Sequence, residues 1–250
     1  MTLLADDISF SYPKNDVIKE ITFSLEEGDY LAVLGTNGAG KSTLLKCLSK
    51  ILNPQLGKVY INGIDSSTLK GTELAKNIAY VPQSHDYSKK TVFDSVLLGR
   101  KPYIKWDVSQ NDIEIVEDIL RLLDLENYSM RYTNELSGGE LQKVIIARAL
   151  AQQPKVLLMD EPTSNLDLKN QIEVLSIIKE IINIQKISAV VTMHDLNLAL
   201  RFANKFILIK EGELFAFGDA TVLNSESIKS VYGVDVVIEE YLGIPVVIPI

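Results

Sequence analysis

A short glycine-rich segment of the chain has the residue types and spacing that bind phosphate groups. It consists of Gly35, Thr36, Asn37, Gly38, Ala39, Gly40, Lys41, Ser42 and Thr43, and we call it the phosphate loop. Its glycines let backbone amides turn toward phosphate oxygens. Lys41 can then reach the β- and γ-phosphates of a nucleotide, while the Ser42 hydroxyl can ligate Mg²⁺. The alternative is a glycine-rich turn that only caps a helix. The strand pattern before the loop and the helix pattern after it favour phosphate binding.

Two acidic residues follow an apolar run that is typical of a strand buried on both faces. The run Val156–Met159 is continuously apolar, and Asp160 and Glu161 come directly after it. An acid at the carboxyl end of such a strand can hold Mg²⁺ beside the phosphates. We therefore predict that Asp160 binds Mg²⁺, directly or through water, and that Glu161 polarises the attacking water. The alternative is a solvated acidic turn, which is less favoured in a chain that also carries a phosphate loop.

The elements that must position these residues alternate between strands and helices. Runs typical of strands precede the phosphate loop, and a helix pattern at 41–51 follows it until Asn53 and Pro54. Apolar residues at spacings of three and four within 113–123 predict an amphipathic helix, in a stretch, 91–150, whose pattern is helical. Strand and helix patterns alternate again after Pro154. Further strands are predicted at 3–10, 20–25, 30–34, 58–62, 78–81, 188–192, 206–209 and 214–217, and further helices at 171–182 and 196–203.

Composition and charge limit the kind of protein further. The chain has 250 residues, 46% of them hydrophobic and 23% charged, as in an ordinary globular protein. Its net charge of −8 argues against nucleic-acid binding, which usually needs a basic face. The apolar tail 241–250 is half as long as the ~20 residues that span a membrane, and residues 1–7 lack the basic start of a secretory signal. Together with a single cysteine, Cys47, these features predict a soluble, cytoplasmic protein.

With the phosphate loop and the acidic pair, several further residues make the sequence resemble the ATP-binding cassette (ABC) ATPases. Ser137, Gly138 and Gly139 alone would predict only a helix N-cap, but in this company they resemble the signature motif of that family. The motifs follow the family's order over nearly the whole chain. The resemblance also matches an aromatic residue that stacks on adenine, a Q-loop glutamine, a D-loop aspartate and a switch histidine to Tyr12, Gln83, Asp167 and His194.

The resemblance implies a nucleotide site shared between two chains. In the family, two chains pair head to tail and bury two ATP molecules between them. Ser137 and the amides around Gly138 and Gly139 would then donate to the γ-phosphate bound by the other chain, with the positive end of a helix in place of a charged side chain. We therefore expect a homodimer that forms on ATP binding, with Asp167 also at the shared site.

The resemblance also implies catalytic roles. Gln83 would ligate Mg²⁺ and link the site to the helical region, and His194 would contact the γ-phosphate and help to hold the water aligned with Glu161. A chain that keeps Lys41, Asp160, Glu161 and His194 together is expected to hydrolyse ATP, with Mg²⁺ as cofactor.

The fold that the resemblance implies is α/β, with a P-loop NTPase core built on a parallel sheet. An N-terminal antiparallel β-subdomain and an inserted α-helical subdomain complete it. We expect one ABC ATPase domain over 1–250, with the helical subdomain at about 87–153 and a C-terminal β-hairpin at about 234–250. We expect the hairpin to close the core and Trp106 to pack under a helix, with a partner-binding surface as the alternative for each. We expect the membrane subunit to dock at the loop 83–106, and His85 to be an ordinary surface residue.

Two segments narrow the kind of ABC protein. The segment 91–102 and the terminal hairpin resemble the importer branch for iron chelates, haem and cobalamin. This implies an ATPase subunit at the cytoplasmic face of the membrane, held by polytopic permease subunits and working indirectly with a substrate-binding protein. A molybdate or tungstate importer, an exporter and an ABC ATPase without a transport role remain alternatives. The transported molecule does not touch this chain, so the sequence does not identify it.

Overall fold

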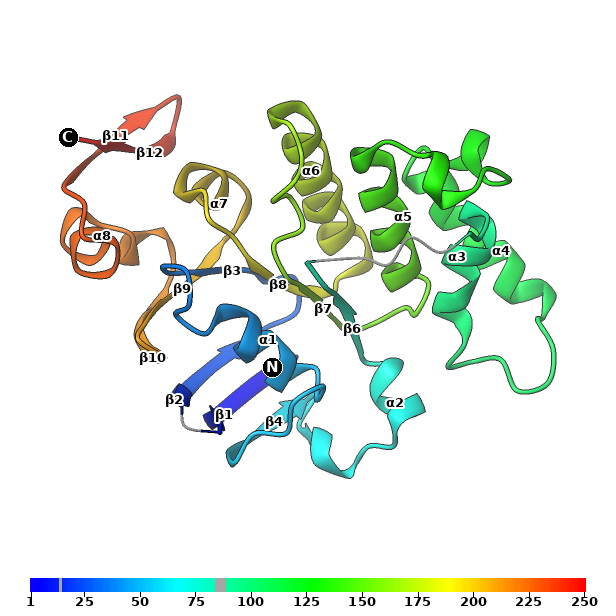
Figure 1. Ribbon diagram of the computed structural model, residues 1–250, viewed down its shortest axis with the longest axis horizontal. Coiled ribbons are helices and arrows are strands. Elements are labelled where there is room, and N and C mark those ends of the chain that lie inside the picture. The colour runs from blue at the N-terminus through cyan, green and yellow to red at the C-terminus, as the bar shows by residue number, and fades with distance from the viewer. Residues whose placement is uncertain (14, 84–88) are drawn as a thin grey trace.

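The computed structural model describes residues 1–13, 15–83 and 89–250, and it is an α/β structure (Figure 1). The strands are β1 Leu3–Tyr12, β2 Asn15–Leu25, β3 Tyr30–Leu34, β4 Leu56–Ile61, β5 Ile64–Asp65, β6 Ile78–Val81, β7 Val156–Met159, β8 Ser188–Thr192, β9 Lys205–Lys210, β10 Glu213–Gly218, β11 Val236–Tyr241 and β12 Ile244–Pro249. The α-helices are α1 Lys41–Leu48, α2 Gly71–Ala75, α3 Val92–Leu97, α4 Gln110–Leu122, α5 Gly138–Leu150, α6 Leu168–Gln185, α7 Leu196–Phe202 and α8 Ser225–Tyr232. Short 3₁₀ helices are η1 Ser66–Thr68, η2 Leu98–Arg100, η3 Glu126–Tyr128, η4 Thr133–Glu135 and η5 Ala220–Val222.

One sheet runs through most of the molecule, in the order β5-β4-β1-β2-β10-β9-β3-β8-β7-β6. The strands β9, β3, β8, β7 and β6 are parallel, whereas β1, β2, β4 and β5 pair antiparallel. Strand β10 joins the two parts: it pairs antiparallel with β9 and parallel with β2. This arrangement, with the helices α3, α4 and α5 grouped at one end of the molecule (Figure 1), confirms the predicted fold class.

The central strands bring the predicted site residues to one edge of the sheet. Every residue of β3, β7 and β8 is buried, as expected for parallel strands covered on both faces. Their registers align Val33 with Thr192 and Met159 with Val191, so the three strands end at one level. The phosphate loop follows β3, and the acidic pair follows β7. Both therefore lie at the carboxyl edge of the sheet, where α/β proteins bind ligands.

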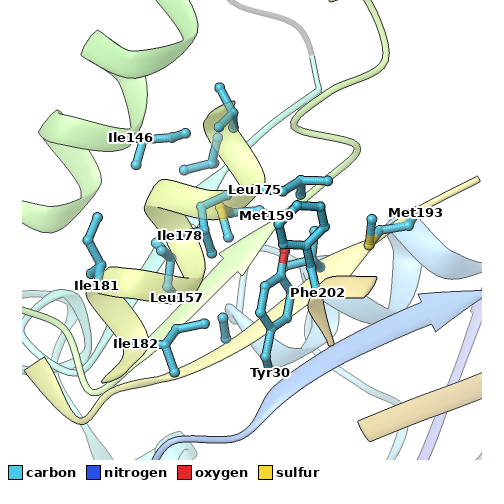
Figure 2. Packing of buried hydrophobic residues seen from close by; sticks show 14 of the residues in the cluster. Tyr30, Ile146, Leu157, Met159, Leu175, Ile178, Ile181, Ile182, Met193 and Phe202 are labelled. Carbon is cyan, nitrogen blue, oxygen red and sulfur yellow. The ribbon is translucent and has the colours of Figure 1, made fainter. Parts of the chain in front are cut away.

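Two hydrophobic clusters hold this sheet, one on each face. On one face, Figure 2 shows Leu175, Ile178, Ile181 and Ile182 of α6 lying over Leu157 and Met159 of β7. Tyr30, Met193 and Phe202 continue this cluster, and Ile146 joins it from α5. On the other face, Leu31 and Val33 of β3 pack with the buried side of α1. The edge that carries the phosphate loop is therefore fixed from both sides.

Several predicted boundaries and one predicted environment were wrong. Helix α1 ends at Leu48 and not near residue 51, because the chain turns there and Lys50 adopts a φ of 60°. Helix α6 begins earlier than predicted, at Leu168, because the Asp167 side chain caps it by accepting from the Asn170 amide. Trp106 does not pack under a helix: it lies in the loop before α4 and is 98% exposed. His85 lies outside the described residues.

No described helix is long and apolar enough to cross a membrane.

A buried ion pair joins the start of α4 to the end of α5. The Arg100 Nε donates to Asp112 Oδ1 at 2.9 Å, and its Nη1 donates to the Ala151 carbonyl at 2.8 Å. Asp112 also accepts from Ser109, the N-cap of α4. Both charged side chains are almost fully buried, at 3% and 6% exposure.

Asp112→Ala is therefore expected to lower the free energy of unfolding by about 3–5 kcal/mol, because it leaves the Arg100 guanidinium buried without its counter-charge. Urea unfolding monitored by circular dichroism measures this change. The control is Asp118→Ala, which removes one of the two acidic partners of the exposed Arg121 on the same helix and is expected to cost under about 1 kcal/mol. Equal effects of the two substitutions would contradict the prediction.

Candidate nucleotide site

The phosphate loop passes close to neighbouring strands at two of its glycines. Gly35 has a φ of 150°, and a Cβ there would lie 2.4 Å from the Ile209 carbonyl oxygen of β9. Gly40 has a φ of 103°, and a Cβ there would lie 2.7 Å from the Ile18 Cδ1 of β2. Only glycine satisfies both requirements. Helix α1 then begins at Lys41, and no described side chain caps its first turn, so its amides remain available to phosphate oxygens.

A cavity of about 160 Å³ lies at the mouth of this loop. Its lining consists of Val17, Asn37, Gly38, Gly40, Lys41, Ser42, Thr43 and Glu161. Lys41 Nζ donates to the carbonyls of Gly35 and Thr36 at 2.8 and 3.0 Å, which holds the ammonium group over the loop. Burial lowers the pKa of Lys41, against the opposing effect of the Glu161 and Asp160 carboxylates. Ala39, within the loop, is buried in the cluster that also contains residues of α1.

Asp160 is the centre of a group of oxygen atoms beside α1. Its Oδ1 accepts from the Ser42 hydroxyl and from the Thr192 hydroxyl, both at 2.9 Å, and its Oδ2 accepts from the Tyr80 hydroxyl at 3.3 Å. Among the described residues there is no group of three or more His, Cys, Asp or Glu placed to hold a metal on its own. One carboxylate and one hydroxyl beside a phosphate cavity match the needs of Mg²⁺, which uses few protein ligands together with substrate phosphates and water.

Glu161 lies between the phosphate loop and the end of β8. Its backbone has a φ of 48°, uncommon for a non-glycine residue, and its amide donates to the Thr192 hydroxyl at 2.7 Å. Its carboxylate accepts from Gln83 Nε2 at 2.5 Å, and His194 Nε2 lies 2.5 Å from the other oxygen. Glu161 also lines a second cavity, of about 210 Å³, on the His194 side. A strained backbone with three side-chain partners indicates a functional position.

The residues of the predicted signature motif lie away from the cavity at the phosphate loop. Ser137 is the N-cap of α5, where its hydroxyl and amide donate to Glu140 Oε2 at 2.7 and 2.8 Å and lower the pKa of that carboxyl. Gly139 packs against Asn170 of α6, and Gly138 lines a small cavity that includes Gln83 and Glu161 but no residue of the phosphate loop.

For Tyr12, Asp167 and Gln83, the described residues show contacts other than the predicted ones. Tyr12, at the end of β1, packs edge-on against Phe10 and does not line the cavity at the phosphate loop. Asp167 serves as the cap of α6. Gln83 contacts Glu161 and not Asp160 or Ser42. The roles of Tyr12 and Asp167 toward ATP, and of Gln83 toward Mg²⁺, stay predictions.

Sequence reasoning missed three residues of the site. Val17 of β2 lines the cavity, Thr192 joins the acidic pair, and Tyr80 contacts Asp160 from β6. A weak signal existed for Thr192, which is a hydroxyl residue closing an otherwise apolar strand. The contact of Tyr80 depends on the pairing of β6 with β7, which no local pattern indicates.

Tyr80→Phe is expected to raise the Mg²⁺ concentration for half-maximal ATP hydrolysis about tenfold. Burial, with the adjacent Asp160 carboxylate, raises the pKa of Tyr80, so its hydroxyl is protonated and orients Asp160. Loss of such an outer contact weakens metal binding. Hydrolysis rates across a Mg²⁺ titration measure the effect, with Tyr60→Phe on β4 as control. An unchanged Mg²⁺ requirement would contradict the prediction.

Comparison with known proteins gives the family. The family model described as ABC transporter matches residues 18–164. An ABC transporter ATP-binding protein of Methanocaldococcus jannaschii is 56% identical over 100% of this chain and 98% of its own length. The chain belongs to the ABC transporter family.

Other ABC proteins that resemble the chain serve different substrates. A probable siderophore transport system ATP-binding protein of Bacillus subtilis is 34% identical over 98% of this chain and 91% of its own length. A phosphonates import ATP-binding protein of Nitratidesulfovibrio vulgaris is 34% identical over 87% and 86%. Among solved structures, a protein classed as a metal-chelate type ABC transporter, in an inward-facing conformation, aligns with a TM-score of 0.86 and 32% identity over 100% of this chain and 96% of its own.

As an ABC ATP-binding subunit, the chain binds and hydrolyses ATP, and such subunits work with membrane permease subunits. A dimeric structure of a bacterial ABC transporter cassette aligns with a TM-score of 0.76 and 28% identity over 87% of this chain and 98% of its own. The ABC family model ends at residue 164, so His194, α7, α8 and the terminal hairpin lie beyond it.

Proposed function

We propose that the chain is the ATPase subunit of an importer for a metal chelate, of the iron-siderophore, haem or cobalamin type. The observation that carries its catalytic part is the convergence of Lys41, Asp160, Glu161 and His194 at one edge of the sheet. The likeness to a siderophore transport subunit and to a metal-chelate type transporter, over nearly the whole chain, supports the substrate class. The subunit would act at the cytoplasmic face of the membrane, bound to permease subunits that receive the chelate from a substrate-binding protein.

The phosphate loop and α1 would hold the triphosphate. The amides of the loop and of the first turn of α1 point a partial positive charge at the phosphates, and Lys41 adds a full charge at the β- and γ-phosphates. Ser42 and Asp160 would hold Mg²⁺, with Thr192 and Tyr80 fixing the Asp160 carboxylate. When bound, Mg²⁺ would neutralise charge on the β- and γ-phosphates. A protein of net charge −8 can thus bind a polyanion through local groups.

Glu161 would orient and polarise the attacking water. It lines the phosphate-loop cavity and the cavity beside His194, so its carboxylate reaches the space between the two. Gln83 and His194 hold one carboxylate oxygen each, which fixes the direction of the other lone pairs. His194 would also contact the γ-phosphate and help to align the water.

A second copy of the chain would complete each site. Ser137 and the glycine amides at the start of α5 carry the positive end of a helix but do not line the chain's own phosphate cavity. A head-to-tail homodimer would bring this helix start to the γ-phosphate bound by the partner. The dimeric cassette among the structural neighbours supports this arrangement.

The permease would dock on the helical region. A cavity of about 400 Å³ lies between α3, α4 and η3, and Phe93, Leu120 and Met130 give it an apolar lining. Trp106 is exposed in the loop that precedes α4, and Gln83 links Glu161 to the segment that leads into α3. A permease segment in this region could therefore act on Glu161 through Gln83.

Reconstitution tests the substrate class. The chain is co-expressed with candidate permeases, the complex is placed in vesicles with its binding protein, and ATP hydrolysis is measured with ferric siderophore, haem, cobalamin or phosphonate. Stimulation by a metal chelate is expected. Stimulation by phosphonate alone would favour the second candidate function, phosphonate import, which the Nitratidesulfovibrio vulgaris relative supports. Stable association with ribosomes or DNA and with no permease would favour an ABC ATPase without a transport role.

A further inference from the structure

The C-terminal hairpin of β11 and β12 is attached to the helix that follows His194. Among the described strands, these two pair only with each other, and they lie at the end of the molecule opposite α3 and α4 (Figure 1). Strand β12 packs against α7. Val236 and Val247 are buried in the cluster that also contains Met193 and Leu198, so the inner face of the hairpin belongs to the part of the core that flanks His194.

One side chain of α7 forms a two-point contact with β12. Asn197 Oδ1 accepts from the Val247 amide at 2.8 Å, and Asn197 Nδ2 donates to the Val247 carbonyl at 3.3 Å. A side-chain amide can both accept and donate hydrogen bonds, as a peptide group does. Asn197 therefore makes the two hydrogen bonds that a neighbouring strand would make at this edge of β12. Pro245 and Pro249 lie two residues to either side on the same edge and lack an amide hydrogen. Between these prolines, Val247 is therefore the one position on this edge whose backbone can both donate and accept a hydrogen bond.

Asn197 is three residues from His194 along a short, closely held path. Asp195 caps α7 by accepting from the amides of Asn197 and Leu198 at 2.8 and 2.9 Å. On the other side of His194, the Met193 amide donates to the Val33 carbonyl of β3 at 3.1 Å. His194 is thus held between the central sheet and the first turn of α7, and that turn is held by β12.

We propose that Asn197 is a positioning residue for ATP hydrolysis: by tying the first turn of α7 to the C-terminal hairpin, it fixes His194 against Glu161. The proposal rests on the proposed role of His194. The proposal gives the hairpin a part in ATP hydrolysis, although the hairpin contributes no residue to the nucleotide site. Without this contact, the first turn of α7 is free to shift and His194 Nε2 moves from Glu161, and small displacements of a catalytic group cost rate more than binding.

The experiment compares ATP hydrolysis and ATP binding of the purified full chain and its variants. Asn197→Ala is expected to lower kcat about 3–10-fold while KM for ATP stays within about twofold. Asn197→Asp keeps the acceptor for the Val247 amide but opposes its carbonyl, so an intermediate kcat is expected. Val247→Pro removes the amide hydrogen at a position between two natural prolines, but it also replaces a buried side chain. It is expected to lower kcat at least as far as Asn197→Ala does.

The matched control is Asn204→Ala at the other end of α7. Asn204 Oδ1 accepts from the Tyr30 amide at 2.9 Å, so the control removes a comparable hydrogen bond of the same residue type far from His194. It is expected to leave kcat unchanged even if the thermal midpoint falls. An equal loss of kcat in Asn204→Ala and Asn197→Ala would mean that Asn197 acts only through stability, which overturns the proposal.

A double-mutant cycle separates this proposal from the role of His194. In the His194→Ala background, Asn197→Ala is expected to have no further effect on kcat, because the group that it positions is gone. A full additional loss would overturn positioning through His194. Impaired hydrolysis in His194→Ala with a normal rate in Asn197→Ala would overturn only the present proposal. A normal rate in His194→Ala would overturn the role of His194 and this proposal with it.

Discussion

Glu161→Gln is expected to leave ATP binding intact and to lower the rate of ATP hydrolysis by about 10²–10⁴-fold. The amide keeps the size of the side chain and can still contact Gln83 or His194, but it cannot polarise water as a carboxylate does. The φ of 48° and the Thr192 contact at the Glu161 amide are backbone features, so the substitution leaves them in place. Because the variant then holds ATP without turnover, a stable dimer is expected to accumulate.

Single-turnover hydrolysis, nucleotide binding and size-exclusion chromatography with ATP measure these three outcomes. Glu213→Gln is a suitable control, because Glu213 lies at the surface of β10 in an exposed pair with Lys19. A Glu161→Gln variant that hydrolyses ATP near the wild-type rate would remove Glu161 from the role of general base. A variant that hydrolyses slowly and also fails to bind ATP would indicate a role in the integrity of the site.

The parts of the site that the sequence predicts best are those carried by consecutive residues. The conformation of the phosphate loop follows from glycines at fixed offsets, and Ser42 and Asp160 belong to segments whose pattern implies their partners. The structure brings the two within 2.9 Å of each other although 118 residues separate them. Parallel strands that end at one level explain this, since both segments follow central strands.

Contacts set by the pairing of distant strands could not be predicted in the same way. Tyr80 and Thr192 reach Asp160 because β6 and β8 flank β7, and strand order is not written in either local sequence. Asn197 reaches Val247 because β12 packs on α7, fifty residues along the chain. Such contacts follow from tertiary packing and carry no motif.

The alternation of strand and helix patterns agrees with the fold class that the resemblance implied, whereas the burial of single side chains was predicted less well. The spacing within 113–123 correctly predicted the buried side of α4, where Val116, Ile119 and Leu120 are buried. Trp106 was assigned to the interior from its residue type alone. Its loop has no periodicity and precedes the Ser109 cap, so nothing there directs the side chain inward. Residue type without spacing is therefore weak ground for predicting burial.

Mixing two inactive variants is expected to restore ATP hydrolysis if each nucleotide site is shared between two chains. Lys41→Ala removes the cation at the phosphate loop, and Ser137→Glu places a negative charge at the helix start that would face the partner's γ-phosphate. Each variant alone has no complete site in a head-to-tail homodimer, so each is expected to lose nearly all hydrolysis. An equal mixture is expected to recover up to about a quarter of the wild-type rate, because half of the dimers are mixed and each mixed dimer has one complete site.

The matched control carries both substitutions in one chain and is mixed with the wild-type chain. In each mixed dimer, both sites then carry one defect each. No hydrolysis is therefore expected beyond that of the wild-type homodimers. Recovery in the first mixture without recovery in the second would follow only if the phosphate loop of one chain works with the signature helix of the other. If mixed dimers form, as seen by co-purification of two tags, and the first mixture stays inactive, the shared site is contradicted. Ser137 would then have to act within its own chain, where Gly138 already lines a cavity with Glu161.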